Sequence, residues 1–297
     1  MKLNHLMAYS NERFPLVNMA LFAILFLTVY SVARFFTPLP AHPATTGIAC
    51  WGMLAVISFF FRLRVFDEIK DYDLDRINHP HRVLQSGRVT LPQLIRLSMA
   101  GGLVEGSWSL YQGPVTLLAW GLALGYSVLM RYEFLVSAFL KKRLVLYAVS
   151  HMLIMPFVIN WIWSAYVPWG AAWQAWGLLV GLSVLSGFSF ELARKLYIPA
   201  DERPLVDSYT KTMGYVPAIV SVLLVLLAGV GVQFYLLALL QAPLFPFGLI
   251  GGLYGLTFIV YTQAIRRPAA KKLKTAGLLV SLFMLTSYLS VILVVNL

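Results

Sequence analysis

Charged residues are scarce in this sequence. Only 12% of its 297 residues are Asp, Glu, Lys or Arg, and just 12 of these are acidic. Ordinary soluble domains carry about 25% charged residues, so a mainly aqueous surface is excluded. Because 60% of the residues are apolar, the composition predicts an integral membrane protein.

Cysteine is almost absent, and this limits the possible cross-links and metal sites. The single residue, Cys50, excludes an internal disulfide and a metal site built from cysteines. The N-terminal residues lack a short apolar core followed by a small-residue cleavage site. We therefore expect no removable signal peptide, and we expect the first membrane span to direct insertion.

Long uncharged runs are abundant, and they set the expected fold. A hydrocarbon core about 30 Å thick needs about 20 apolar residues in a helix. Residues 144–190 and 212–265 contain no charged residue and are each long enough for two spans, and prolines at Pro38, Pro40 and Pro43 end the first span. The sequence thus predicts an all-α protein with nine transmembrane helices, at about 15–36, 44–63, 91–111, 114–131, two in 144–190, two in 212–265 and 275–296.

Lysine and arginine concentrate in alternate connections, namely 62–96, 131–143, 194–211 and 266–274. Positively charged loops are retained in the cytoplasm. We therefore expect a bacterial-type inner membrane protein with a cytoplasmic N-terminus and a C-terminus on the opposite side. The acidic stretches within 67–75 and 191–207 would then face the cytoplasm.

Five of the twelve acids fall within nine residues, Asp67 to Asp75. Glu68, Asp71 and Asp75 are spaced to share one face of a helix, where like charges repel. A bound cation removes this repulsion, and oxygen ligands without His or Cys suit a hard ion such as Mg²⁺. Mg²⁺ held by few carboxylates is commonly completed by a substrate phosphate. The stretch therefore predicts a site for Mg²⁺ and a phosphorylated ligand.

A second acidic patch holds Glu191, Asp201, Glu202 and Asp207. It follows the sixth expected span, as the first patch follows the second. This relation suggests one domain over 1–297 with a pseudo-repeat, about 15–131 and 144–265, before the last span at 275–296. The two patches would face each other across the bundle.

Three motifs carry a resemblance to a known family. The stretch from Asp67 to Asp75 resembles the first aspartate-rich motif of the UbiA superfamily of intramembrane prenyltransferases, Asn-Asp-x-x-Asp-x-x-x-Asp, with Asp67 in place of Asn and Glu68 in place of the first Asp. Residues 78–89 are similar to the family's Asn-x-x-x-Arg-Pro-x-x-x-Gly segment, although Val83 replaces Pro. Residues 126–131 resemble its Tyr-Ser-x-x-x-Arg.

The resemblance implies a helical bundle around a central lipid-accessible cavity with cytoplasmic cap loops. It also implies two Mg²⁺ ions that bind an isoprenyl diphosphate, whose prenyl group passes to a small aromatic or other lipophilic acceptor. The expected metal ligands are Asp67, Glu68, Asp71, Asp75, Asp201, Glu202 and Asp207, among which Asp71, Asp75, Asp201 and Asp207 are expected to be catalytic. The expected diphosphate ligands are Arg64, Lys70, Arg82, Tyr126, Arg131, Arg194 and Lys195.

The second patch departs from the family's Asp-x-x-x-Asp, so Glu191 is kept as a reserve ligand. His151 is a further reserve residue, either as a proton acceptor for a phenolic substrate or as a hydrogen-bonded histidine within the bundle. Glu105, deep in the third span, is either functional or a side chain that reaches back to the outer surface.

Two other functions fit the same acids. A membrane terpene cyclase would ionise a prenyl diphosphate and then use the substrate's own double bond, and its product would form without an acceptor. A divalent-cation transporter would need acids near the membrane midplane, whereas these acids cluster at one side. A nucleic-acid partner is not expected, because the positive charge is placed as membrane topology requires.

Overall fold

The computed structural model describes residues 2–37, 46–202 and 207–296. These residues fold as helices joined by short connections, without a β-strand in the described part of the chain. The expected end of the first span at Pro38, Pro40 and Pro43 lies outside the described residues.

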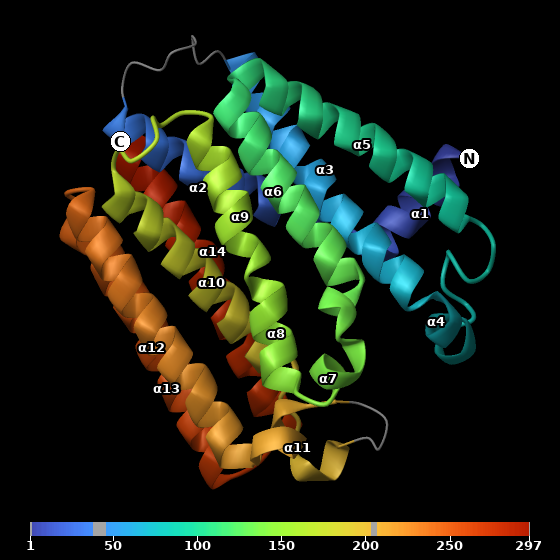
Figure 1. Ribbon diagram of the computed structural model, residues 1–297. Helices are drawn as coiled ribbons and strands as arrows, with labels where there is room; N and C mark the ends of the chain where they lie inside the picture. Colours follow the sequence, from blue (N-terminus) through green and yellow to red (C-terminus); the bar gives the residue numbers. More distant parts are fainter. Residues whose placement is uncertain (1, 38–45, 203–206, 297) are drawn as a thin grey trace.

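The long helices form a closed ring (Figure 1), in which each helix packs against the next and α14 packs against α2. In order, the ring contains α2 (Leu16–Phe36), α3 (Thr46–Lys70), α5 (Leu91–Gln112), α6 (Pro114–Arg131), α8 (Leu144–Met152) with α9 (Ile154–Ser164), α10 (Trp173–Arg194), α12 (Tyr215–Leu239), α13 (Leu244–Arg266) and α14 (Ala270–Asn296). The ring confirms the predicted all-α membrane fold. The pseudo-repeat within it stays a prediction.

Eight helical segments of the described chain are long and apolar enough to cross a membrane. The remaining expected span, the third, corresponds to α5, which is long enough at 22 residues but less apolar than the other eight. Its polarity has a structural role, because Glu105 on α5 is fully buried in an ion pair with Arg62 on α3. The Trp120 indole on α6 also donates a hydrogen bond to Glu105 at 2.9 Å. Glu105 therefore does not reach back to the surface.

A close approach of α5 to α3 accompanies this ion pair. A Cβ added at Gly102 would lie 3.1 Å from an Nη atom of Arg62. Such a contact is tighter than ordinary van der Waals packing. Glycine at this position therefore leaves room for the guanidinium between the two helices.

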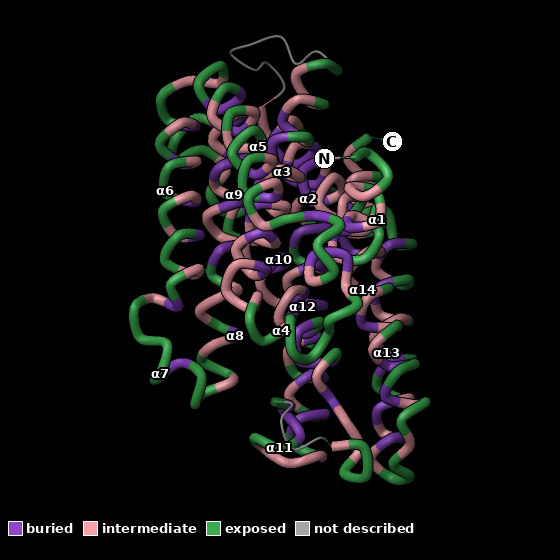
Figure 2. Tube along the Cα trace, turned by 90° about the vertical axis from the view of Figure 1, so that its right-hand side faces the viewer, coloured by how far each residue is buried: buried purple, intermediate pink, exposed green. Residues whose placement is uncertain are grey.

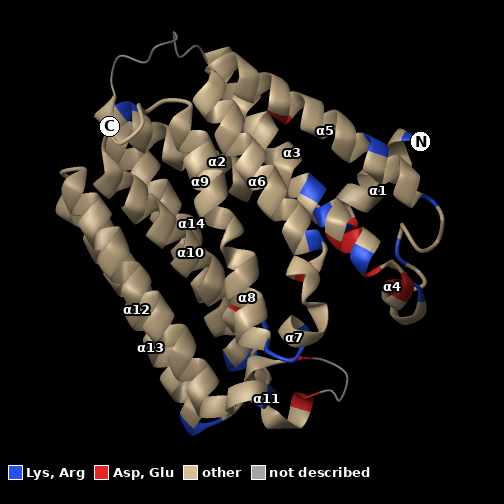
Figure 3. Ribbon diagram, viewed as in Figure 1, with Lys and Arg blue, Asp and Glu red and all other residues tan. Residues whose placement is uncertain are grey.

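Buried and exposed positions alternate along the long helices (Figure 2), as expected for helices with one face toward the bundle. Charged residues gather where α3 and α10 end and where α8 begins (Figure 3). Short helices meet the same end: α1 (Leu3–Arg13), α4 (Tyr72–Asn78), η1 (Glu133–Leu135), α7 (Ser137–Lys141), η2 (Pro199–Asp201) and α11 (Tyr209–Met213). Arg13 contacts this charged end through Glu68, whereas Asn296 contacts Ser31 near the other end of α2. The two chain ends thus lie at opposite ends of the bundle.

One of the spans is broken where α8 meets α9, at Leu153. Pro156 explains the break, because it lacks the N–H that would bond to the carbonyl of Met152, and its ring crowds that carbonyl. The interruption leaves His151 and Met155 on the two sides of the break, and both line the same cavity. The proline therefore helps to shape the charged end of the bundle.

Candidate functional site

A cavity of about 520 Å³ lies among the ends of α3, α6, α8 and α10. Its deeper lining includes Phe60, Leu63 and Ile154, whereas its other lining residues are mostly ionisable. The ionisable side chains are Arg64, Asp67, Lys70, Asp71, Arg131, Tyr147, His151, Glu191, Arg194 and Lys195. The cavity therefore combines an apolar part with a strongly charged part.

The first acidic motif splits between two environments. Helix α3 ends at Lys70, and α4 starts after Asp71, although backbone hydrogen bonds continue from Asp71 to Asp67 (2.9 Å) and from Asp75 to Asp71 (2.8 Å). Asp67 and Asp71 line the cavity. Residues four apart share a helix face, so this pair presents two carboxylates to the same space.

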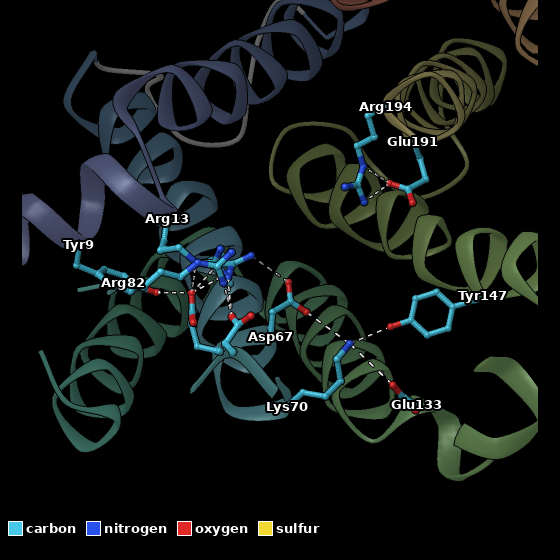
Figure 4. Close-up of polar contacts among 12 residues, drawn as sticks. Tyr9, Arg13, Asp67, Lys70, Arg82, Glu133, Tyr147, Glu191 and Arg194 are labelled. Atoms are coloured by element: carbon cyan, nitrogen blue, oxygen red, sulfur yellow. Dashed lines mark hydrogen bonds and ion pairs between the residues drawn. The ribbon is translucent and has the colours of Figure 1, made fainter. Parts of the chain in front are cut away.

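Glu68 and Asp75 do not line the cavity, and arginines hold both of them. Glu68 is buried and pairs with Arg13 at 2.6 Å and with Arg64 at 2.8 Å. Asp75 pairs with Arg82 at 2.5 Å. These contacts hold α1 against the end of α3 and the segment after α4 against α4 itself (Figure 4). In this structure both carboxylates are fully engaged by cations.

The Asp67 and Asp71 carboxylates are much less engaged. Asp67 lies 3.8 Å from Arg64 and 3.9 Å from Lys70, and Asp71 makes no ion pair within 4.0 Å in the described part of the chain. Burial raises the pKa of Asp71, and the Lys70 ammonium opposes this shift. A divalent cation would stabilise the ionised form, and carboxylate oxygens are suitable ligands for it.

The α10 wall of the cavity is mainly cationic. Its only carboxylate among the described lining residues is Glu191, which pairs with Arg194 at 2.5 Å and with Lys195 at 2.8 Å. Figure 4 shows Glu191 and Arg194 across an open space from Asp67. Arg131 adds a further cation from α6 and lies 5.2 Å from the centre of the Phe66 ring.

The other acids of the second patch lie outside this lining. Asp201 lines a separate cavity of about 460 Å³ between α10 and α14. Glu202 accepts hydrogen bonds from Ser208 (2.7 Å) and from Thr210, and Asp207 is exposed. Within the described residues, no group of three or more His, Cys, Asp or Glu side chains is arranged to hold a metal ion. The metal and catalytic roles expected for these three acids stay predictions.

Two residues at the site, Tyr147 and Glu133, were not anticipated from the sequence. The Lys70 ammonium donates to the Tyr147 hydroxyl at 2.8 Å and lies 3.9 Å from the buried Glu133 carboxylate. Glu133 is the only acid between Arg131 and Arg143. A single acid in a segment rich in lysine and arginine was the sequence signal that could have identified Glu133.

The segment that carries Glu133 has an unusual backbone. Glu133, Phe134 and Leu135 have φ values of 50°, 54° and 61°. The left-handed region costs an ordinary residue about 1–2 kcal/mol. The Phe134 ring packs edge-on against Tyr126 and His151, so this strained segment rests directly on residues near the cavity.

His151 has one occupied and one available ring nitrogen. Its Nδ1 lies 2.8 Å from the backbone carbonyl of Tyr147, which can only accept, so Nδ1 carries the proton. Its ring stacks on the Tyr147 ring at 4.0 Å. Nε2 has no hydrogen-bond partner among the described residues. Tyr126, by contrast, donates to the Ser150 carbonyl at 2.7 Å and is not part of the lining.

Comparisons with known proteins agree with this architecture. The model of the UbiA prenyltransferase family matches residues 40–287. No curated protein matches the sequence. Similar solved structures share less than 25% identity with this chain, so they inform on its fold alone.

A solved structure of digeranylgeranylglyceryl phosphate synthase is 17% identical, with a TM-score of 0.71, and the alignment covers 99% of this chain and 100% of that one. A UbiA homologue from Aeropyrum pernix K1 has 16% identity and a TM-score of 0.62 over 89% of this chain and 95% of that one. A homologue from Archaeoglobus fulgidus bound to GPP and Mg²⁺ has 15% identity and a TM-score of 0.54, with 96% and 99% covered.

Proposed function

Because the chain belongs to the UbiA prenyltransferase family, and is thus an enzyme of that type, we propose that it is a Mg²⁺-dependent membrane prenyltransferase. It transfers an isoprenyl group from an isoprenyl diphosphate to a small aromatic or other lipophilic acceptor. The Archaeoglobus fulgidus homologue has been solved with GPP and with DMAPP, each together with Mg²⁺. These ligands support the proposed substrate class and the use of a divalent ion.

One observation carries the proposal. Asp67 and Asp71 lie on one wall of a cavity whose other walls present Arg131, Arg194 and Lys195 above an apolar lining. Acids for a cation and basic groups for an anion therefore meet beside a space that accepts a hydrocarbon chain. This combination suits a ligand with a diphosphate at one end and a prenyl chain at the other.

The carboxylates present fit a divalent ion. Asp67 and Asp71 would hold it, since both line the cavity and neither makes an ion pair shorter than 3.8 Å in the described part of the chain. When bound, Mg²⁺ stabilises the negative charge that develops on the departing diphosphate. The resemblance to the family implies two such ions.

The cationic side chains have a direct part in this reaction. When the allylic C–O bond breaks, its electron pair leaves with the diphosphate. Arg131, Arg194 and Lys195 then stabilise that charge through fixed positive groups. The apolar lining keeps water away from the allylic cation, which would otherwise be hydrolysed. Attack by the acceptor forms the new bond to carbon and releases a proton.

His151 is suited to take up that proton. Its Nδ1 proton is committed to the Tyr147 carbonyl, so the unprotonated Nε2 is the free acceptor on a residue that lines the cavity. The stack on Tyr147 and the edge contact with Phe134 hold the ring in place. We therefore assign His151 as the proton acceptor for an aromatic or hydroxyl-bearing substrate.

The distribution of charge supports a membrane orientation for this site. The positively charged connections and the cavity lie at the same end of the bundle (Figure 3). Since such connections stay in the cytoplasm, the active site would face the cytoplasm of a bacterial-type inner membrane. The N-terminus would lie on that side and the C-terminus on the other.

A product assay tests the proposal. Purified protein is incubated with prenyl diphosphates of several chain lengths, with and without phenolic acceptors, in Mg²⁺ or in EDTA. Mass spectrometry should find a prenylated acceptor that requires Mg²⁺. A cyclic hydrocarbon formed without any acceptor would favour the cyclase instead, and uptake of labelled Mn²⁺ by proteoliposomes without prenyl transfer would favour the transporter.

A further inference from the structure

We propose that the cavity binds its diphosphate together with a single divalent ion, and that Lys195 and Arg194 occupy the part of the site where a second ion would be expected. This inference rests on the proposed function, which it makes more specific. It follows from a difference between two walls of the cavity, those of α3 and α10.

The α3 wall offers two carboxylates one helical turn apart. Asp67 and Asp71 both line the cavity, and the cations nearest to Asp67 lie 3.8 Å and 3.9 Å away. Two carboxylates of this kind, completed by water and phosphate oxygens, are a common environment for Mg²⁺. One ion is therefore accommodated here without breaking a close ion pair.

The α10 wall offers one carboxylate and two cations. Glu191 is followed at the third and fourth positions by Arg194 and Lys195, which share its side of the helix and pair with it at 2.5 Å and 2.8 Å. A divalent ion bound to Glu191 would displace both cations and then lie beside their positive charges. The position one turn after Glu191 therefore carries an ammonium where a second ion would require an acid.

Other acids do not relieve this shortage within the described residues. Glu68 and Asp75 do not line the cavity, and both are paired with arginines. Glu202 is bonded to Ser208 and Thr210, and Lys211 lies 3.8 Å from it. Asp201 lines the separate cavity between α10 and α14, and Asp207 is exposed. A second ion on the α10 side would have to recruit one of the engaged acids or draw Asp201 or Asp207 into the cavity.

The balance of charge favours the same conclusion. The cavity lining contains three carboxylates and five lysine or arginine side chains, which leaves two positive charges before any ligand binds. An isoprenyl diphosphate carries about three negative charges near neutral pH. With one divalent ion the occupied cavity would hold a single excess positive charge. A second ion would raise the excess to three, in a site with little water to screen it.

Lysine differs from a metal ion in a way that can be measured. Its ammonium is a fixed part of the chain and offers three hydrogen-bond donors to phosphate oxygens. Diphosphate binding should therefore depend only partly on metal. We expect weak binding of inorganic pyrophosphate to persist in EDTA, and we expect Lys195→Met to remove most of it.

Equilibrium dialysis of the purified full-length protein with ⁵⁴Mn²⁺ and ³²P-labelled inorganic pyrophosphate tests the number of ions. Mn²⁺ and pyrophosphate should be bound in a ratio of one at saturation. Lys195→Asp should raise the ratio to two, because it places a second carboxylate one turn after Glu191. Lys142→Met, an exposed lysine outside the cavity lining, is the matched control and should leave the ratio at one.

Each outcome decides a different point. A ratio of two in the wild type would overturn the inference while supporting the proposed function. A ratio of one in both the wild type and Lys195→Asp would show that Lys195 does not exclude the second ion, and would also overturn the inference. If pyrophosphate does not bind with or without Mn²⁺, both the inference and the proposed function fail. Circular dichroism of each variant controls for folding.

Discussion

The Lys70 ammonium lies 3.9 Å from the buried carboxylate of Glu133 while it donates to the Tyr147 hydroxyl at 2.8 Å. Lys70 comes from the end of α3, whereas Glu133 and Tyr147 come from segments on either side of α7. Figure 4 shows the Tyr147 hydroxyl and the Glu133 carboxylate on one side of Lys70, with Asp67 on the other side. The Lys70 ammonium is therefore positioned by Tyr147, which lines the cavity, and by Glu133, which does not.

Glu133→Gln should weaken binding of the prenyl diphosphate. The substitution removes the negative charge 3.9 Å from the Lys70 ammonium, and an ion pair of partly exposed groups contributes up to about 1 kcal/mol. We expect KM to rise about fivefold with little change in kcat, since about 1.4 kcal/mol corresponds to a factor of ten. Steady-state kinetics over a range of diphosphate concentrations measure this. An unchanged KM would contradict a positioning role for Glu133.

Asp71→Asn should abolish metal-dependent turnover while the protein still inserts in the membrane. The amide keeps the size of the side chain but removes the charge that would hold Mg²⁺, and loss of several kcal/mol of metal stabilisation reduces kcat about 100-fold or more. Asp73, two residues away, is exposed and does not line the cavity. Asp73→Asn is thus the control, and equal losses in the two variants would contradict the assigned role of Asp71.

His151→Phe should separate ionisation of the substrate from transfer. The variant keeps an aromatic ring against Tyr147 but has no nitrogen to accept a proton. General-base catalysis contributes about 10²–10⁴ in rate, so transfer should fall at least 100-fold. Release of pyrophosphate from the same substrate, followed by a coupled colorimetric assay, should continue because the cation can react with water. Normal transfer by this variant would exclude His151 as the proton acceptor.

Glu105→Leu should destabilise the bundle far from the cavity. It leaves the Arg62 guanidinium buried without its counter-charge, which in buried pairs costs about 3–5 kcal/mol. The double variant with Arg62→Met should recover much of this loss, because two apolar residues can replace a buried pair. Thermal unfolding in detergent measures both. Ser107→Ala, at an exposed position on α5, is the control, and a double variant less stable than Glu105→Leu would contradict this account.

The sequence predicted the long helices well, because hydrophobic thickness sets a minimum length for an uncharged run. It also identified Asp67, Asp71, Arg64, Lys70, Arg131, Arg194 and Lys195, which the structure places together in the cavity lining. The spacing of the acids along the sequence could not show which of them line the cavity and which pair with arginines. Glu68 and Asp75 face arginines, and one of these, Arg13, is more than fifty residues earlier in the chain.

Other features were hidden for a similar reason. The sequence predicts Glu191 only as a reserve ligand, yet it is the acid of the second patch that lines the cavity. Asp201 lies seven residues beyond the end of α10 and lines another cavity. The path of the chain after a helix decides which of several nearby acids points inward. Periodicity ceases to be informative where the helix ends.

The break at Pro156 has a thermodynamic consequence for ligand binding. Pro156 interrupts the span whether or not a substrate is present. The free energy needed to separate α8 from α9 is therefore already part of the folding of the ligand-free protein. Preorganisation of this kind leaves more of the interaction energy available as affinity. A heat-capacity change on binding should then reflect the apolar surface of the prenyl chain that is buried, with no added contribution from refolding of these two helices.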